Sequence, residues 1–298
     1  MNQLGMRPEE VRAEISKYRW YHEIEVLPGL ITPSACPHFK NMWDFNLNCL
    51  KAVDFRNKRV LDIGCRDGLF SLHAERAGAR EVVGIDNDLS PGLANFLIPF
   101  FRSRIHLAEL NLYQLDPGRE GRFDVILWFG VLYHLRYPFH GIRKVLDCVT
   151  PGGVLALETA TLSTPHLAEQ ELLYCPVEGS PYDEPTSCTF FNRKALTTTL
   201  DSLGFVLEKA ATFRPGLQAG VEPFASPPVS RGLRAAWRNL RARFRPLRME
   251  VAREFLIFRK ASQDSLPDYR MKNGRTFTRP WAEGYWDATH REHTGEKK

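Results

Sequence analysis

The sequence predicts a doubly wound α/β protein whose central sheet is mostly parallel. From residue 59 to residue 158, short apolar segments alternate with helical segments, which is the pattern of consecutive βαβ units. A turn that contains glycine follows the first apolar segment, and a carboxylate closes the second. Ligands of such sheets bind at the carboxyl ends of the strands, so both features lie where a ligand site is expected.

The elements are expected in a regular order along the chain. Residues 1–51 are predicted to form a helical N-terminal extension, with helices over 7–20 and about 40–54. The core then runs through strand 59–63, helix 68–77, strand 81–85, helix 90–101, strands 104–108 and 123–128, helix 138–149 and strand 153–158.

The remaining strands are expected after a loop over 162–190. A helix over 192–203 ends at Gly204, because helices commonly end at a glycine in the C′ position. Strands 205–210 and 254–259 follow and bring the sheet to seven strands. The main domain is therefore predicted to cover 52–260 with an insertion at about 212–250, and 261–298 form a C-terminal tail.

The turn after the first strand is the most informative motif. Asp62 lies at the strand end, and Gly64, Cys65, Arg66 and Gly68 follow it. A tight turn is expected to leave N–H groups free for a ligand at the start of the next helix. The carboxylate favours a cofactor with an ammonium or sulfonium group over a pyrophosphate. Arg66 replaces the middle glycine of the pattern Gly-x-Gly-x-x-Gly, which argues against a nicotinamide-dependent oxidoreductase.

Further candidate site residues follow the other strands. Asp86 closes the second strand 18 residues after Gly68, where an acidic side chain can bind the ribose hydroxyls of an adenosine. Other positions at the same edge of the sheet are Asn87, Asn111, Leu112, Phe129, Gly130 and Tyr133.

Three segments resemble the class I S-adenosylmethionine-dependent methyltransferases. They are VLDIGCRDG at 60–68, FDVILWFGVLYH at 123–134 and PGGVLALET at 151–159. The second and third segments, with HLRYP after Tyr133, are most similar to the branch that contains the bacterial wobble-uridine tRNA carboxymethyltransferases. The resemblance implies a Rossmann-like methyltransferase domain.

The resemblance also implies S-adenosyl-L-methionine as the cofactor. Asp62 and Gly64 would then face its methionine part, and Asp86 would bind its ribose. By the same resemblance Asn111 and Leu112 would border the adenine, and the Gly130 carbonyl and Tyr133 would also contact the cofactor.

Two neighbouring residues are candidates for catalysis. Methyl transfer from a sulfonium depends mainly on alignment and desolvation, and it needs a base only where the acceptor loses a proton. His134 is the candidate base, since imidazole titrates near neutrality, and Tyr133 lies beside it. The alternative is that His134 only orients the loop before Pro138. Lys40 and Trp43 lie in the region that holds the cofactor carboxylate in the carboxymethyltransferases but do not align with it, so plain methyl transfer is preferred.

The composition limits which classes of protein the chain can belong to. The 298 residues carry a net charge of +5, and no apolar run approaches the roughly 18 residues that span a bilayer. Six cysteines without a Cys-x-x-Cys pair predict reduced thiols and a cytoplasmic protein. His290 and His293 resemble the end of a zinc finger, but no paired cysteines precede them, so no metal site is predicted.

Residues 231–248 predict an inserted, amphipathic basic helix with seven arginines and no acidic residue. Arg234, Arg238 and Arg241 can contact RNA phosphates, a membrane surface or an acidic acceptor. Alternatively, the segment is a lid whose arginines are only solvated.

Three hypotheses for the function follow. The preferred one is a methyltransferase that acts on a small-molecule acceptor. The second is an RNA-modifying methyltransferase or carboxymethyltransferase that acts on tRNA. The third is a binding protein that keeps the fold without activity.

Overall fold

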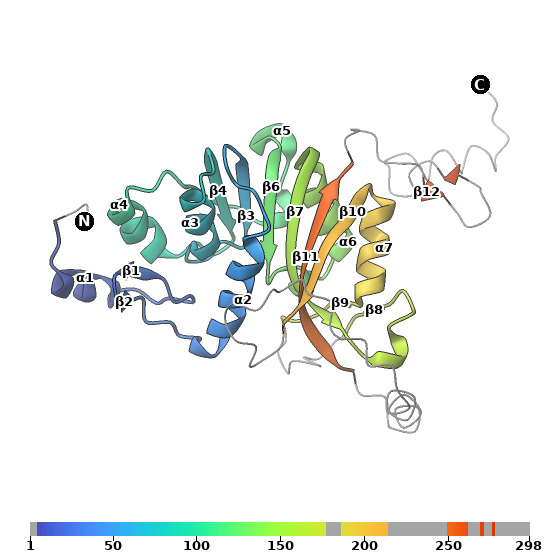
Figure 1. Ribbon diagram of the computed structural model, residues 1–298, viewed down its shortest axis with the longest axis horizontal. Coiled ribbons are helices and arrows are strands. Elements are labelled where there is room, and N and C mark those ends of the chain that lie inside the picture. The colour runs from blue at the N-terminus through green and yellow to red at the C-terminus, as the bar shows by residue number, and fades with distance from the viewer. Residues whose placement is uncertain (1–4, 177–185, 214–248, 262–268, 271–275, 278–298) are drawn as a thin grey trace.

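The computed structural model describes residues 5–176, 186–213, 249–261, 269–270 and 276–277, and it contains one large sheet. The strand order is β10-β11-β7-β6-β3-β4-β5 (Figure 1). Neighbouring strands are parallel from β7 to β5, whereas β11 is antiparallel to both β7 and β10. The strands are β3 (Arg59–Ile63), β4 (Glu81–Asp86), β5 (His106–Glu109), β6 (Phe123–Phe129), β7 (Val149–Leu162), β10 (Phe205–Thr212) and β11 (Val251–Lys260). The predicted seven-stranded, mostly parallel sheet is confirmed.

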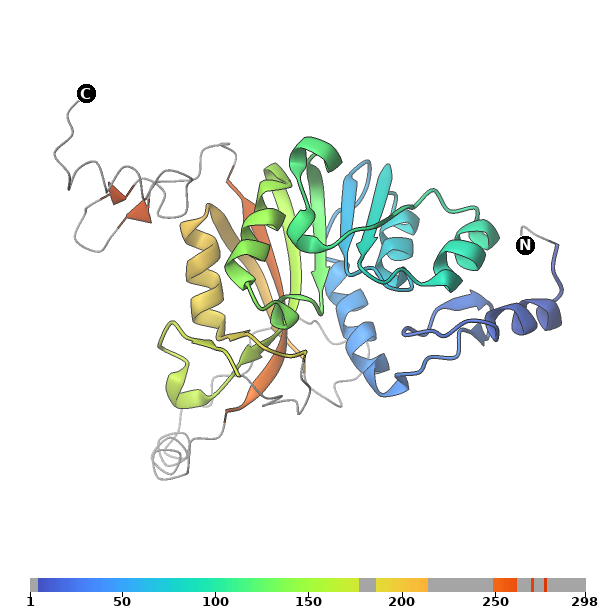
Figure 2. The ribbon, with the colours of Figure 1, turned by 180° about the vertical axis from the view of Figure 1, so that it is seen from behind.

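Helices cover both faces of the sheet, as Figures 1 and 2 show from opposite sides. Side chains alternate between the two faces along each strand, so Val60 packs with one cluster and Leu61 with the other. The first cluster joins the sheet to α2 (Lys40–Leu50) and α3 (Leu69–Arg76). The second joins it to α6 (Pro138–Asp147) and α7 (Arg193–Ser202). The doubly wound arrangement is therefore confirmed.

The N-terminal extension is only partly helical. α1 (Pro8–Ile15) ends earlier than the predicted helix over 7–20, and the buried Trp20 donates its indole N–H to the Ile15 carbonyl at 2.7 Å. A hairpin of β1 (Glu25–Leu27) and β2 (Leu30–Ile31) follows. Its turn contains Pro28 and Gly29, where the backbone of Gly29 has a φ of 75° that favours glycine.

One predicted helix is irregular. Within 90–101, residues Leu93–Leu97 form a π-helical turn and α4 (Ile98–Phe101) follows. Pro99 has no N–H with which to continue an α-helical hydrogen-bond series, so the segment does not form one regular helix.

Several predicted boundaries also shift. β7 extends beyond the predicted 153–158 because β11 pairs with it as far as Leu162. The remaining elements are short: η1 (Pro37–Phe39), η3 (Leu112–Gln114), α5 (Pro117–Glu120), η4 (Leu132–His134), η5 (Pro165–Leu167), β8 (Leu173–Tyr174), β9 (Phe190–Phe191), β12 (Tyr269–Arg270) and β13 (Thr276–Phe277).

Some predictions concern residues that the structure leaves undescribed. The basic helix over 231–248, with Arg234, Arg238 and Arg241, lies outside the described residues, as do His290 and His293. Within the described ranges, none of the helices has both the length and the apolar character that crossing a bilayer requires. All six cysteines are free thiols.

A buried ion pair fastens α7 to the sheet and gives a test of the fold. Glu254 on β11 is 5% exposed, and its carboxylate accepts from Arg193 Nε at 2.9 Å. Arg193→Met leaves this carboxylate buried without its cation and should lower the free energy of unfolding by about 1–3 kcal/mol, since the arginine is itself half exposed. The measurement is urea denaturation. Arg143→Met, which breaks the surface pair with Asp147, should cost less than about 0.5 kcal/mol. Equal losses in the two variants would contradict this account of the pair.

Candidate functional site

The glycine turn after β3 is fixed to the end of β4. The N–H groups of Gly64 and Cys65 both donate to the Ile85 carbonyl, at 2.8 and 3.1 Å. Gly64 has a φ of 74°, and a Cβ at this position would lie 2.5 Å from Val131 Cγ2. Glycine is therefore required both by the backbone conformation and by the close approach of the neighbouring loop.

The N–H groups of this turn are not left free, as the sequence had suggested. Besides the two bonds to Ile85, the Arg66 N–H donates to Asp86 Oδ2 at 3.0 Å. The Gly68 N–H donates to the Cys65 carbonyl at 2.7 Å. The expectation was wrong for these four groups because the turn satisfies them internally, which makes it rigid.

Asp86 stands beside the turn, with its carboxylate held in place by the backbone. It accepts from the N–H of Arg66 and, at 3.0 Å, from the N–H of Asp88. The Arg66 side chain donates to the carbonyl of Asp88 at 3.0 Å and also pairs with its carboxylate. The arginine at the glycine position therefore bonds back to the protein, and its backbone takes a left-handed φ of 46°.

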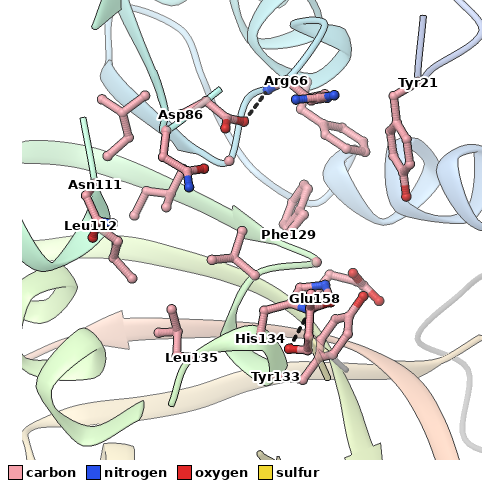
Figure 3. Close-up of a pocket in the computed structure, with 18 of the residues that line it drawn as sticks. Tyr21, Arg66, Asp86, Asn111, Leu112, Phe129, Tyr133, His134, Leu135 and Glu158 are labelled. Atoms are coloured by element: carbon pink, nitrogen blue, oxygen red, sulfur yellow. Dashed lines mark hydrogen bonds between the residues drawn. The ribbon is translucent and has the colours of Figure 1, made fainter. Parts of the chain in front are cut away.

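A cavity of about 910 Å³ opens between this turn and the loop after β6. Arg66 and Asp86 lie on one side of it (Figure 3). The predicted site residues that line the cavity are Gly64, Arg66, Asp86, Asn87, Asn111, Leu112, Phe129, Gly130, Tyr133 and His134. The structure thus brings together residues from the ends of β3, β4, β5 and β6.

The loop after β6 forms the opposite side of the cavity. Gly130 has a φ of 70°, and its N–H donates to the Glu158 carbonyl at 3.0 Å. The Tyr133 ring stacks beside Phe190. The backbone carbonyl of Tyr133 accepts from the N–H groups of Cys188 and Thr189. His134 Nδ1 lies 3.1 Å from the Thr186 carbonyl. A carbonyl only accepts, so Nδ1 carries the proton and Nε2 is the unprotonated nitrogen of the neutral ring.

Three predicted residues of the strand end and the turn are absent from the cavity lining. Asp62 is 1% exposed, and its Oδ2 accepts from the Ser71 hydroxyl at 2.6 Å. Burial raises the pKa of this carboxyl to about 7. Cys65 is buried against Gly84, and Gly68 starts α3 with a φ of 77°. None of these side chains lines the cavity.

The N-terminal extension supplies a wall of the cavity, and among the residues of this wall only Trp43 had been considered from the sequence. Tyr21, His22, Met42, Trp43 and Asn46 all line the cavity. The aromatic run at 20–22 is the signal in the sequence that could have pointed to them.

Asp67, in the glycine turn, holds this wall. Its Oδ2 accepts from the His22 N–H at 2.8 Å and from the Tyr21 N–H. Lys40, by contrast, pairs with Asp44 at 2.8 Å and is absent from the lining.

An ion pair between two neighbouring strands also lines the cavity. Arg253 on β11 donates to both carboxylate oxygens of Glu158 on β7, at 2.6 and 2.7 Å. Glu158 is 1% exposed, and the guanidinium lies 4.7 Å from the centre of the Tyr133 ring. Figure 3 shows Glu158 beside Tyr133 and His134. The sequence shows Glu158 at the end of the predicted strand, but its partner comes from a strand distant in the chain.

Residues 41–210, more than half of the chain, match the protein family described as "Methyltransferase domain". The chain belongs to this family. The predicted resemblance to methyltransferases is thereby confirmed.

Two relatives that match part of this methyltransferase by sequence carry the same name. The tRNA U34 carboxymethyltransferase of Pseudomonas paraeruginosa is 37% identical over 113 residues, which is 36% of this chain and 34% of that protein. The enzyme of the same name from Methylococcus capsulatus is 38% identical over 103 residues, 34% of this chain and 32% of that protein. The chain therefore spans about a third of the length of these relatives.

Solved structures share the fold at low sequence identity. The N-terminal domain of EvdMO1 with SAH bound has a TM-score of 0.57 at 16% identity, covering 86% of this chain and 98% of that chain. The Burkholderia thailandensis 1,6-didemethyltoxoflavin-N1-methyltransferase, with S-adenosylhomocysteine (SAH), has a TM-score of 0.51 at 16% identity, covering 86% and 91%. These likenesses confirm the Rossmann-like methyltransferase fold.

The pKa of Asp62 predicts a dependence of stability on pH. The unfolded carboxyl has a pKa near 3.9, so between about pH 4 and 7 the folded state keeps a proton that the unfolded state loses. Asp62 therefore lowers the free energy of unfolding increasingly as the pH rises, by up to a few kcal/mol at pH 7. Asp62→Asn should remove this loss, so its stability relative to wild type should increase from pH 4 to 7 and then stay constant. Urea denaturation at several pH values measures it, and a difference that does not vary with pH contradicts the assignment.

Proposed function

We propose that this protein transfers a methyl group from S-adenosyl-L-methionine to a small-molecule acceptor. The observation that carries the proposal is that the N-terminal extension forms one wall of the cavity. Its residues Tyr21, Trp43 and Asn46 face the same space as Asp86 and Tyr133. A cavity of about 910 Å³ suits a cofactor with a small second ligand.

The residues present fit the proposed donor. Gly64 lets the neighbouring loop approach closely, and Asp86 presents carboxylate oxygens to the cavity beside the turn. Asn111 and Leu112 follow β5 and line the part of the cavity suited to an adenine. Asn111 is held there because its side-chain oxygen accepts from the Tyr113 N–H at 3.0 Å. When bound, the donor supplies a methyl group already activated by the sulfonium.

The protein then aligns the acceptor and excludes water. Tyr21, Trp43 and Tyr133 offer aromatic surfaces at the part of the cavity proposed for the acceptor. Where the acceptor loses a proton, His134 accepts it at Nε2, while the Thr186 carbonyl holds the proton on Nδ1.

Plain methyl transfer is favoured over carboxymethyl transfer because Lys40 and Arg253, two of the basic residues that could hold a donor carboxylate, are already paired. Lys40 is paired with Asp44 outside the lining. Arg253 already makes a two-point contact with the buried Glu158. A further carboxylate placed beside Glu158 would be desolvated and repelled, which opposes a carboxylated donor.

Transfer to tRNA is the second candidate. The sequence similarity to tRNA U34 carboxymethyltransferases favours it, although the matched part is about a third of those proteins. The seven arginines of 231–248 would supply phosphate contacts.

A labelling experiment distinguishes the two acceptors. The purified protein is incubated with methyl-labelled S-adenosylmethionine and either the small-molecule filtrate of a cell lysate or total tRNA. We expect label in the filtrate and none in the tRNA, because the N-terminal extension lines the part of the cavity proposed for the acceptor and the ion pair of Glu158 and Arg253 there is internally neutralised. Label confined to tRNA would contradict the proposal.

The arginines provide the control for this experiment. In the triple variant Arg234→Ala, Arg238→Ala and Arg241→Ala, transfer to the filtrate should persist. If tRNA were the acceptor, the wild-type affinity for tRNA should fall steeply with salt, and the triple variant should lose much of that dependence.

A further inference from the structure

The α-ammonium group of the donor has no carboxylate from β3 to bind. Asp62, which the sequence places at the methionine part of the donor, is 1% exposed and is absent from the cavity lining. Its carboxylate accepts from the Ser71 hydroxyl instead. The acidic residue of the turn that contacts the cavity wall is Asp67. Its carboxylate bonds to the backbone of His22, and His22 lines the cavity.

Asp67 fixes the position of His22. Its Oδ2 accepts from the backbone N–H of His22 at 2.8 Å and from that of Tyr21. The segment that carries His22 is therefore held against the same turn that carries Gly64. His22 and Gly64 both line the cavity.

The surroundings of His22 define which ring nitrogen carries the proton. Nδ1 is buried without a hydrogen-bond partner and lies 3.7 Å from Asp67 Oδ2. A proton on Nδ1 is attracted by the carboxylate, whereas a lone pair there would be repelled, so the structure favours the Nδ1–H tautomer. The lone pair is then on Nε2, to which no residue in the described part of the chain donates a hydrogen bond.

The ring is also held in place and kept neutral. It packs edge-on against Tyr21, Trp43 and Phe70, with ring centroids 4.8, 5.1 and 5.7 Å away. Burial, with the charge of Arg66 nearby, lowers the pKa of His22 to about 3. A neutral imidazole accepts a hydrogen bond from an ammonium group, whereas an imidazolium would repel it.

We propose that His22 Nε2 accepts a hydrogen bond from the α-ammonium of the donor's methionine part, and that Asp67 is the positioning residue that sets the tautomer and place of His22. This inference rests on the proposed donor and is independent of the acceptor. It makes the N-terminal extension part of the donor site as well as a wall for the acceptor.

The test compares two ligands by calorimetry, SAH and an SAH analogue that lacks the α-amino group. Wild type should bind SAH at least tenfold more tightly than the analogue, because a hydrogen bond to a charged group is lost. His22→Phe keeps an aromatic ring in the packed site and should bind both ligands about equally. His73→Phe, the same change on α3 away from the cavity lining, should keep the wild-type preference. An unchanged preference in His22→Phe would overturn the inference, while SAH binding itself would still stand.

Two further measurements keep the proposal falsifiable if His22→Phe does not fold. Nitrogen NMR of wild type should show His22 protonated on Nδ1 and bare on Nε2, and a proton on Nε2 would overturn the proposal. In Asp67→Asn the amide oxygen can take the place of Oδ2 and still accept from the two backbone N–H groups, but the negative charge that attracts a proton to Nδ1 is lost. The preference for SAH over the analogue should be weaker in that variant than in wild type, and an unchanged preference would contradict the positioning role.

Discussion

The site depends on a single carbonyl group at the end of β4. The Ile85 oxygen accepts from both Gly64 and Cys65, and only a residue that tolerates a φ of 74° with no Cβ can make this approach. These two hydrogen bonds hold the turn after β3 against the end of β4. Asp86, which follows Ile85 in the chain, therefore lies beside the turn. The N–H of Arg66 then completes the arrangement by donating to Asp86. The donor side of the cavity is thus a consequence of strand order and one turn.

The part of the site that belongs to the parallel strands could be predicted from the sequence. The turn glycine, Asp86 and Asn111 each follow an apolar segment, and parallel strands bring their carboxyl ends to one edge. The residues on the extension could not be predicted in this way. Tyr21 and His22 are placed by Asp67, more than 40 residues along the chain, and nothing local in either segment specifies that contact. The contact between Glu158 and Arg253 could not be predicted either, because it depends on the register between β7 and β11. The two residues are 95 apart in the sequence.

The two acidic residues of the turn differ because of burial. The sequence favours Asp62 as the charged group, yet the Ser71 hydroxyl and the surrounding core leave it walled off with a raised pKa. Asp67 instead bonds to the extension and reaches the cavity through His22. Glu158 and Arg253 neutralise each other, and the aromatic rings of Tyr21, Trp43 and Tyr133 line the same cavity. Together these features support the proposed site for a cationic donor and a small acceptor.

Calorimetry of SAH binding to Asp86→Asn tests the central claim most directly, since the account assigns the ribose of the donor to this carboxylate. Loss of charge-assisted hydrogen bonds should weaken binding about tenfold to a hundredfold relative to wild type. Asp201→Asn, on the exposed side of α7, should bind SAH as wild type does. Unchanged affinity in Asp86→Asn would contradict the placement of the donor beside the glycine turn.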